Sequence, residues 1–137
     1  VYNISTIEQG SLFMGYRSEV ILVVGKEVMP QFLVTLAKSR ETRVLCYNDT
    51  DKYIQNHEEE GTCLFYWGHI KWYDSFEEVQ AIEDFLDWCE SEDIEVDGDQ
   101  RGACEFVQFL RIGEELDDME ARGHGYYNVG INRSIDF

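Results

Sequence analysis

Residues 20–24 constrain the fold of this chain more than any other segment. These five consecutive residues are apolar and mostly β-branched, a composition typical of a strand at the centre of a sheet. A helix that crosses a bilayer needs about 20 apolar residues, so the run is too short for a membrane span. The first residues of the chain also lack the charged and apolar regions of a signal peptide. We therefore expect a cytoplasmic protein with a central strand and no membrane association.

Two segments have the apolar periodicity of amphipathic helices. Residues 29–40 place Pro30 where it suits a first helical turn. Residues 75–90 begin with a Ser-Phe-Glu-Glu pattern typical of a capping box, in which Ser75 and Glu78 would satisfy two free N–H groups. The stripe that the first helix is expected to bury consists of Phe32, Leu33, Leu36 and Ala37.

Strands are expected on both sides of these helices. The last segment, residues 127–137, alternates apolar and polar side chains, as a strand with one buried face does. Gly68 is expected to mark a bulge in a long aromatic strand, and the polar residues 49–60 form a short helix or a loop. The predicted strands are residues 11–16, 19–25, 43–47, 62–73, 105–112 and 127–137.

The order of these elements from residue 19 is β-α-β-β-α-β, followed by an additional C-terminal strand. This order is typical of the ferredoxin-like, split βαβ arrangement, an α+β fold with helices on one face of a mainly antiparallel sheet. The chain has 137 residues, 44% of them hydrophobic, which is enough for one domain over residues 1–137. The fold serves many functions and does not indicate one.

Charge is the most informative part of the composition. The chain has 11 Lys and Arg against 28 Asp and Glu, a formal net charge of −17. Direct binding to nucleic acid or to anionic lipid is therefore not expected, because both need basic residues. The charge is also uneven, since residues 74–137 have nineteen acids and four bases. This acidic C-terminal half is where we expect the functional surface.

Twelve of those acids lie within residues 74–99, where there is no Lys or Arg. On the second helix they face away from the apolar stripe, and no cation at i+4 relieves their repulsion. Trp88 falls outside the stripe, and Trp is enriched among the residues that dominate binding energy. A solvated acidic face, and a Trp88 covered by the following loop, are the alternatives. The predicted partner-binding residues are Glu77, Glu83, Asp84, Asp87, Trp88, Glu90, Glu92, Asp93, Glu95, Asp97, Asp99, Asp117 and Asp118.

Motifs for metal binding and catalysis are weak. Residues 93–98 resemble the start of an EF-hand loop, but the position of its last ligand falls on Cys104 and a strand is predicted to follow. We expect an acidic loop there, with weak binding of a divalent cation as the alternative. The four cysteines form no C-x-x-C pair and are expected to be reduced thiols. The three histidines belong to no catalytic pattern, so we expect neither an enzyme nor a cofactor or metal site.

The function expected from these features is that of a non-enzymatic inhibitor. Duplex DNA carries one charge per roughly 1.7 Å, and the acidic helix with its following loop approaches that order of density. The partner would be a basic protein, such as a nucleic-acid-binding protein or a nuclease, whose groove the chain enters as a nucleic-acid mimic. In size and charge the chain is similar to the acidic inhibitors that phages and mobile elements use against restriction enzymes and CRISPR effectors, a similarity of composition only. The alternatives are an immunity-type domain that neutralises a basic protein, and a small-ligand-binding domain that uses the sheet face.

Overall fold

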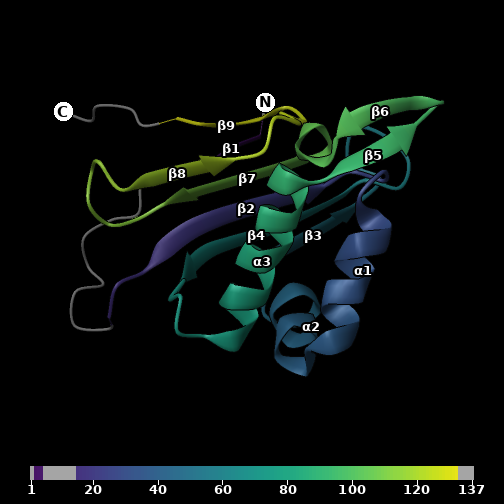
Figure 1. The fold of residues 1–137 in the computed structure, drawn as a ribbon. Coiled ribbons are helices and arrows are strands. Elements are labelled where there is room, and N and C mark those ends of the chain that lie inside the picture. The colour runs from purple at the N-terminus through teal and green to yellow at the C-terminus, as the bar shows by residue number, and fades with distance from the viewer. Residues whose placement is uncertain (1, 5–14, 133–137) are drawn as a thin grey trace.

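A five-stranded antiparallel sheet forms the centre of the computed structural model, which describes residues 2–4 and 15–132 (Figure 1). Residues 20–24 have no exposed surface, which confirms the predicted central strand. The α+β class and the mainly antiparallel sheet are confirmed as well. The strands lie in the order β3 (Lys52–Gln55), β4 (Cys63–Ile70), β2 (Ser18–Val24), β7 (Val107–Ile112) and β8 (Met119–Arg122).

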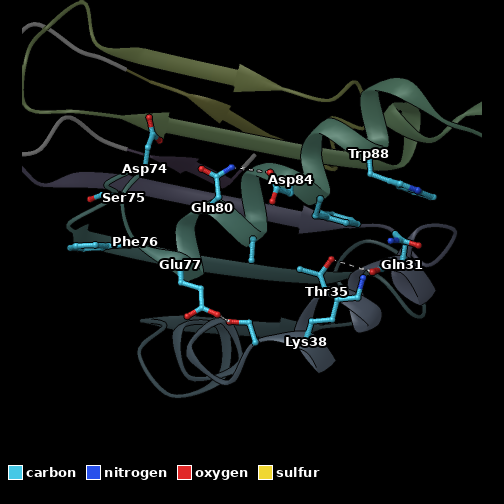
Figure 2. A pocket seen from close by; sticks show the side chains of 13 residues that line it. Gln31, Thr35, Lys38, Asp74, Ser75, Phe76, Glu77, Gln80, Asp84 and Trp88 are labelled. Carbon is cyan, nitrogen blue, oxygen red and sulfur yellow. Dashed lines mark hydrogen bonds between the residues drawn. The ribbon is translucent and has the colours of Figure 1, made fainter.

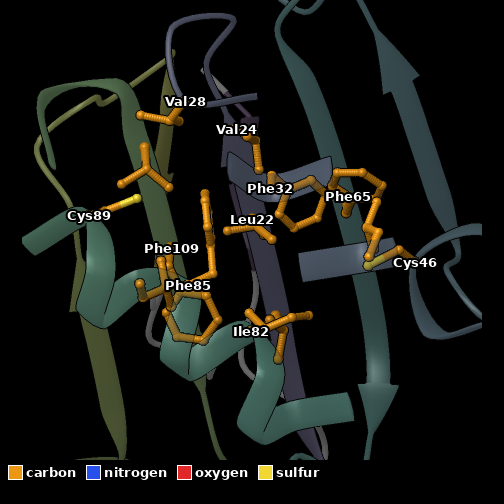
Figure 3. Close-up of a cluster of buried hydrophobic side chains, with 14 of the residues drawn as sticks. Leu22, Val24, Val28, Phe32, Cys46, Phe65, Ile82, Phe85, Cys89 and Phe109 are labelled. Atoms are coloured by element: carbon orange, nitrogen blue, oxygen red, sulfur yellow. The ribbon is translucent and has the colours of Figure 1, made fainter. Parts of the chain in front are cut away.

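Three helices cover one face of this sheet: α1 (Met29–Lys38), α2 (Arg40–Tyr47) and α3 (Glu77–Ser91) (Figure 1). The aromatic ring of Phe32 connects them to the sheet (Figure 3). Its centroid lies 5.6 Å from that of Phe65 on β4 and 5.1 Å from that of Phe85 on α3, within the range of favourable aromatic pairs. The predicted stripe of α1 is half right, since Phe32 and Leu36 are buried whereas Leu33 and Ala37 are exposed.

The opposite face of the sheet is covered in part by a short parallel pair of strands, β1 (Tyr2–Ile4) and β9 (Val129–Ile131). Val129 is buried against Ile21 and Val23 of β2, and Tyr127 and Ile131 pack beside it. The apolar face predicted for the last segment is therefore confirmed up to residue 131. Residues 133–137, and most of the strand predicted at 11–16, lie outside the described residues.

Residues 43–47 are not a strand, and this prediction is wrong. They belong to α2, which buries Thr42, Leu45 and Cys46 at helical spacing. Ser39 alone separates α2 from α1, and its Oγ accepts a hydrogen bond from the N–H of Thr42 at 3.2 Å, which caps the helix start. The strand of this region is β3, within the segment predicted to be a short helix or a loop.

Residues 93–102 form a hairpin rather than the expected acidic loop. Strand β5 (Asp93–Val96) pairs with β6 (Asp99–Gly102), and the turn between them holds Asp97 and Gly98 at φ values of 52° and 86°. An Asp-Gly pair suits such a left-handed two-residue turn. A 3₁₀ turn, Ala103–Phe106, then leads into β7. This hairpin and α2 are additional to the predicted β-α-β-β-α-β order of elements, so the ferredoxin-like order stays a prediction.

Two local predictions concern α3 and β4. The capping box is wrong, because Phe76 is the N-cap residue and no side chain caps the first turn of α3. On β4 the register with β2 shifts where Gly68 was expected to bulge: Ser18 lies opposite Ile70, and Val20 lies opposite Trp67. Three residue steps on β4 therefore oppose two on β2.

Candidate functional site

The predicted site residues of α3 divide into two flanks. At about 100° per residue, one flank contains Glu83, Asp87 and Glu90, and the other contains Glu77 and Asp84 together with Trp88. The first flank faces β8, whose Arg122 contacts it. The second faces α1 across a groove (Figure 2). The predicted acidic face is therefore two surfaces with different surroundings.

Arg122 offsets part of the charge of the first flank. Its guanidinium donates to Glu83 Oε2 at 2.5 Å, to Asp87 Oδ1 at 2.5 Å and to Glu90 Oε1 at 2.8 Å. These contacts raise the pKa of Arg122, the hydrogen bond with Glu90 most of all. The sequence-based expectation that the acids of this helix are uncompensated is wrong for these three residues. The cation comes from another strand, 32 positions after Glu90 in the chain, which i+4 spacing along a helix does not reveal.

Glu83 is the most enclosed member of this cluster, with 16% of its side chain exposed. Burial raises its pKa, and the Glu120 carboxylate nearby adds to the rise. Hydrogen bonds from Arg122 and from Trp72 Nε1, the latter 3.2 Å from Glu83 Oε1, act in the opposite direction. Glu83 therefore has a structural role and is not free to contact a partner.

The second flank of α3 borders a groove of about 620 Å³. Thr35 and Ser39 line its opposite wall, and Ala81 lies on the α3 side. These side chains are too short to fill the space between two helices, which explains why the groove exists. Its lining residues are Gln31, Thr35, Lys38, Ser39, Asp74, Ser75, Phe76, Glu77, Gln80, Ala81, Asp84, Phe85 and Trp88.

Three predicted site residues meet at this groove. Trp88 is half-buried and packs against the margin of the core, so the sequence was right that it stands outside the buried stripe. Asp84 is exposed and accepts a hydrogen bond from Gln80 Nε2 at 2.8 Å. Glu77 is exposed and accepts a longer one, 3.4 Å, from Ser39 Oγ. Figure 2 shows these α3 side chains facing the α1 residues Gln31, Thr35 and Lys38.

The hairpin carries a group of exposed acids. Glu92, which ends α3, and the four acids of residues 93–99 are all exposed. Within residues 15–132, none of the five has a Lys or Arg nitrogen within 4 Å, the distance that defines the ion pairs of this chain. Ile94 and Val96 alternate with these acids and pack against the core, which fixes the outward direction of the others. Figure 1 shows the hairpin at the edge of the molecule, beyond the end of α3.

The second predicted cluster, at Asp117 and Asp118, is divided in a similar way. Asp117 is exposed in the loop before β8. Asp118 accepts a hydrogen bond from Tyr16 Oη at 2.5 Å and two from the guanidinium of Arg111, at 2.8 and 3.2 Å. Arg111 in turn contacts Glu120 at 3.2 Å. Asp118 therefore holds the chain together rather than presenting a free charge.

Metal binding, membrane insertion and thiol chemistry are the other possibilities that the described part of the chain bears on. No set of three or more His, Cys, Asp or Glu within it is placed to hold a metal ion. None of its helices has the length and apolar character needed to cross a membrane. All four cysteines are free, as the spacing predicted, and burial raises the pKa of Cys46 and of Cys89 to about 12.

Comparisons of the chain with protein-family models, with curated proteins and with solved structures found no match. The candidate site is therefore the surface that the geometry itself defines: the exposed acids of the hairpin and the groove between α1 and α3.

Proposed function

We propose that this protein is a non-enzymatic binding domain that covers a basic, nucleic-acid-binding surface of a partner protein. The single observation that carries the proposal is the hairpin, whose acids are exposed and lack an ion pair within residues 15–132. Acids that are already paired gain little from a new cation, whereas these five are exposed, and Arg101, which lies on β6 of the same hairpin, forms its ion pair with Glu105 instead.

The density of charge on the hairpin supports nucleic-acid mimicry more than that on the helix does. Each hairpin strand has four residues and spans about 13 Å. Asp93, Glu95 and Asp99 lie on the two strands, and Asp97 in the turn and Glu92 before β5 bring the number of acids within roughly that length to five. One strand of B-DNA carries a charge every 3.4 Å or so. On α3, by contrast, Arg122 offsets part of the charge of three carboxylates. The hairpin is therefore the part that enters a basic groove in this proposal.

Free thiols suit a reducing compartment, so a cytoplasmic location belongs to the same proposal. The alternative is a domain that neutralises a basic protein away from its nucleic-acid site, as immunity-type proteins do. The two differ in competition, because only a mimic is displaced when nucleic acid is added.

The proposal is tested by capture from a cell extract with two variants of equal net charge. The hairpin variant combines Asp93→Asn, Glu95→Gln and Asp99→Asn. The control variant combines Glu41→Gln, Asp49→Asn and Glu60→Gln, three acids that are also exposed but lie on α2 and in loops. We expect the hairpin variant to lose the proteins that the parent captures and the control to retain them. Equal capture by both variants, or an equal loss, would reject the hairpin as the binding surface.

A further inference from the structure

The floor of the groove between α1 and α3 is apolar. Phe76 and Trp88 are half-buried and pack against the margin of the core, and Phe85 is buried between them along α3. Ala81 adds a short side chain to the same floor. Covering apolar surface that is open to water lowers its free energy, so the groove favours an occupant with apolar side chains.

The outer face of α1 carries a separate apolar surface, none of whose residues lines the groove. Pro30, Leu33, Val34 and Ala37 are exposed, and their spacing of three and four residues places them on one side of the helix. Leu33 is 51% exposed and Val34 is 43% exposed. Single exposed apolar residues are common, but four at helical spacing form a continuous patch, and such patches mark interaction sites. Leu33 and Ala37 were predicted to be buried because their helical spacing is the same as that of a buried stripe.

Charge at the groove is asymmetric. The α3 side carries Asp74, Glu77 and Asp84, and the only cation in the lining is Lys38, at the C-terminal end of α1. All four side chains are exposed. An occupant with Lys or Arg along the side that faces α3 is complementary to this pattern, whereas an acidic occupant meets repulsion.

The length of the groove indicates the shape of its occupant. From Phe76 to Trp88 the α3 side extends about 18 Å at 1.5 Å per residue, which matches three turns of a second helix. Amphipathic helices bind in such grooves through anchors at i, i+3 or i+4, and i+7. We infer that the groove between α1 and α3 binds an amphipathic, basic helix of the partner, with its apolar anchors on the floor and its cations beside Asp84 and Glu77. The inference rests on the proposed function, because it names the segment of the basic partner that this site takes.

The test uses two synthetic peptides of identical composition and charge. One is a Leu- and Lys-containing peptide with Leu at i, i+3, i+4 and i+7, and the other has the same residues in an order without helical periodicity. Trp88 reports docking through its fluorescence, since Trp67 and Trp72 are buried. The variant Trp88→Phe establishes which part of the signal belongs to Trp88. We expect the periodic peptide to bind at least about tenfold more tightly, which is the factor that 1.4 kcal/mol supplies.

Two variants place the peptide in the groove. Ala81→Gln and Thr35→Gln lengthen a side chain from either wall, keep the net charge and suit a helix. Each is expected to weaken the periodic peptide by about tenfold, the effect of obstructing one anchor, and to leave the other peptide unaffected. Two independent positions keep the test decisive if one variant fails to fold, which circular dichroism melting establishes.

The possible results separate this inference from the proposed function. Equal binding of the two peptides, no binding of either, or full affinity in both groove variants would overturn the groove inference. A small molecule from the extract that is retained by the parent, and lost from both groove variants while the peptides fail to bind, would assign the groove to that ligand instead. The hairpin variant tests the proposed function alone, since its three substitutions lie outside the groove lining. A loss of capture in that variant with no peptide binding leaves the proposed function standing and removes only the groove inference.

Discussion

Arg122 connects β8 to α3, and its replacement by Met is expected to destabilise the fold. The substitution removes the donor for three carboxylates while it keeps an apolar stem of similar length. The contact with Glu83 joins side chains that are 14% and 16% exposed, and a hydrogen bond between charged groups contributes about 1.5–3 kcal/mol. Asp87 and Glu90 are 67% and 47% exposed, so solvent screening reduces each of their contributions to a few tenths of a kcal/mol.

The three contacts together suggest a loss of about 3 kcal/mol in the free energy of unfolding. In a domain of this length, that corresponds to a melting temperature lower by about 10 °C. The assay is thermal and urea unfolding of the parent, Arg122→Met and Arg101→Met. Arg101→Met is the matched control. Like Arg122, Arg101 lies on a β-strand and forms an ion pair, but its pair with Glu105 is exposed. The melting temperature of this control is expected to stay near that of the parent.

The pH dependence shows whether charge is the cause. The pKa of Glu83 is raised in the folded state, so its ionised carboxylate lowers the free energy of unfolding. This cost is absent below the unfolded pKa and grows as pH rises through the folded pKa. Losing Arg122 raises that pKa further. The gap between parent and variant should therefore be largest at neutral pH and shrink towards about pH 4.5, close to the ordinary value for Glu. A gap of equal size at both pH values would refute the electrostatic argument. Asp87→Lys is likewise expected to lower the melting temperature, since it places a second cation beside Arg122.

Three further results are expected. Gly98→Ala should lower the free energy of unfolding in urea by about 1 kcal/mol, because φ is +86° there and a Cβ in the left-handed region costs about that much; an unchanged value would contradict the turn assignment. Cys46 and Cys89, with pKa values of about 12, should resist alkylation at neutral pH until the protein unfolds, as mass spectrometry of labelled peptides will reveal. Trp88→Ala should still fold, with a lower melting temperature because the half-buried ring packs against the core, and should dissociate faster from the partner in surface plasmon resonance; a variant that unfolds would place Trp88 in the core.

Periodicity and composition predicted much of the fold but little of its charge pairing. The central strand β2 follows from a continuous apolar run, and the helix α3 follows from apolar residues at helical spacing. Residues 43–47 were misassigned because a short run of apolar residues fits either element, and tertiary contacts decide; Trp67 Nε1 of β4 donates to the carbonyl of Leu45 at 3.0 Å. The Asp97-Gly98 pair is a hairpin signal in the sequence, but the spacing of the acids around it also fits the start of an EF-hand loop.

The candidate site was predicted in part. The acids of the hairpin and the position of Trp88 outside the buried stripe follow from the sequence. The pairing of Arg122 with Glu83 does not, because 39 residues separate them in the chain and only the sheet brings them together. The groove is equally invisible in the sequence, since it depends on which short side chains of α1 and α3 face each other.

Displacement of a captured partner by nucleic acid tests the central claim most directly. The complex that the parent chain forms in an extract at low salt is challenged with a short DNA duplex or a structured RNA, and in parallel with sodium chloride at the same ionic strength. Salt alone screens the acidic surface only weakly at that concentration. Release by nucleic acid and retention in sodium chloride is the result predicted for a domain that occupies a nucleic-acid-binding surface. A partner that stays bound in both would contradict the claim.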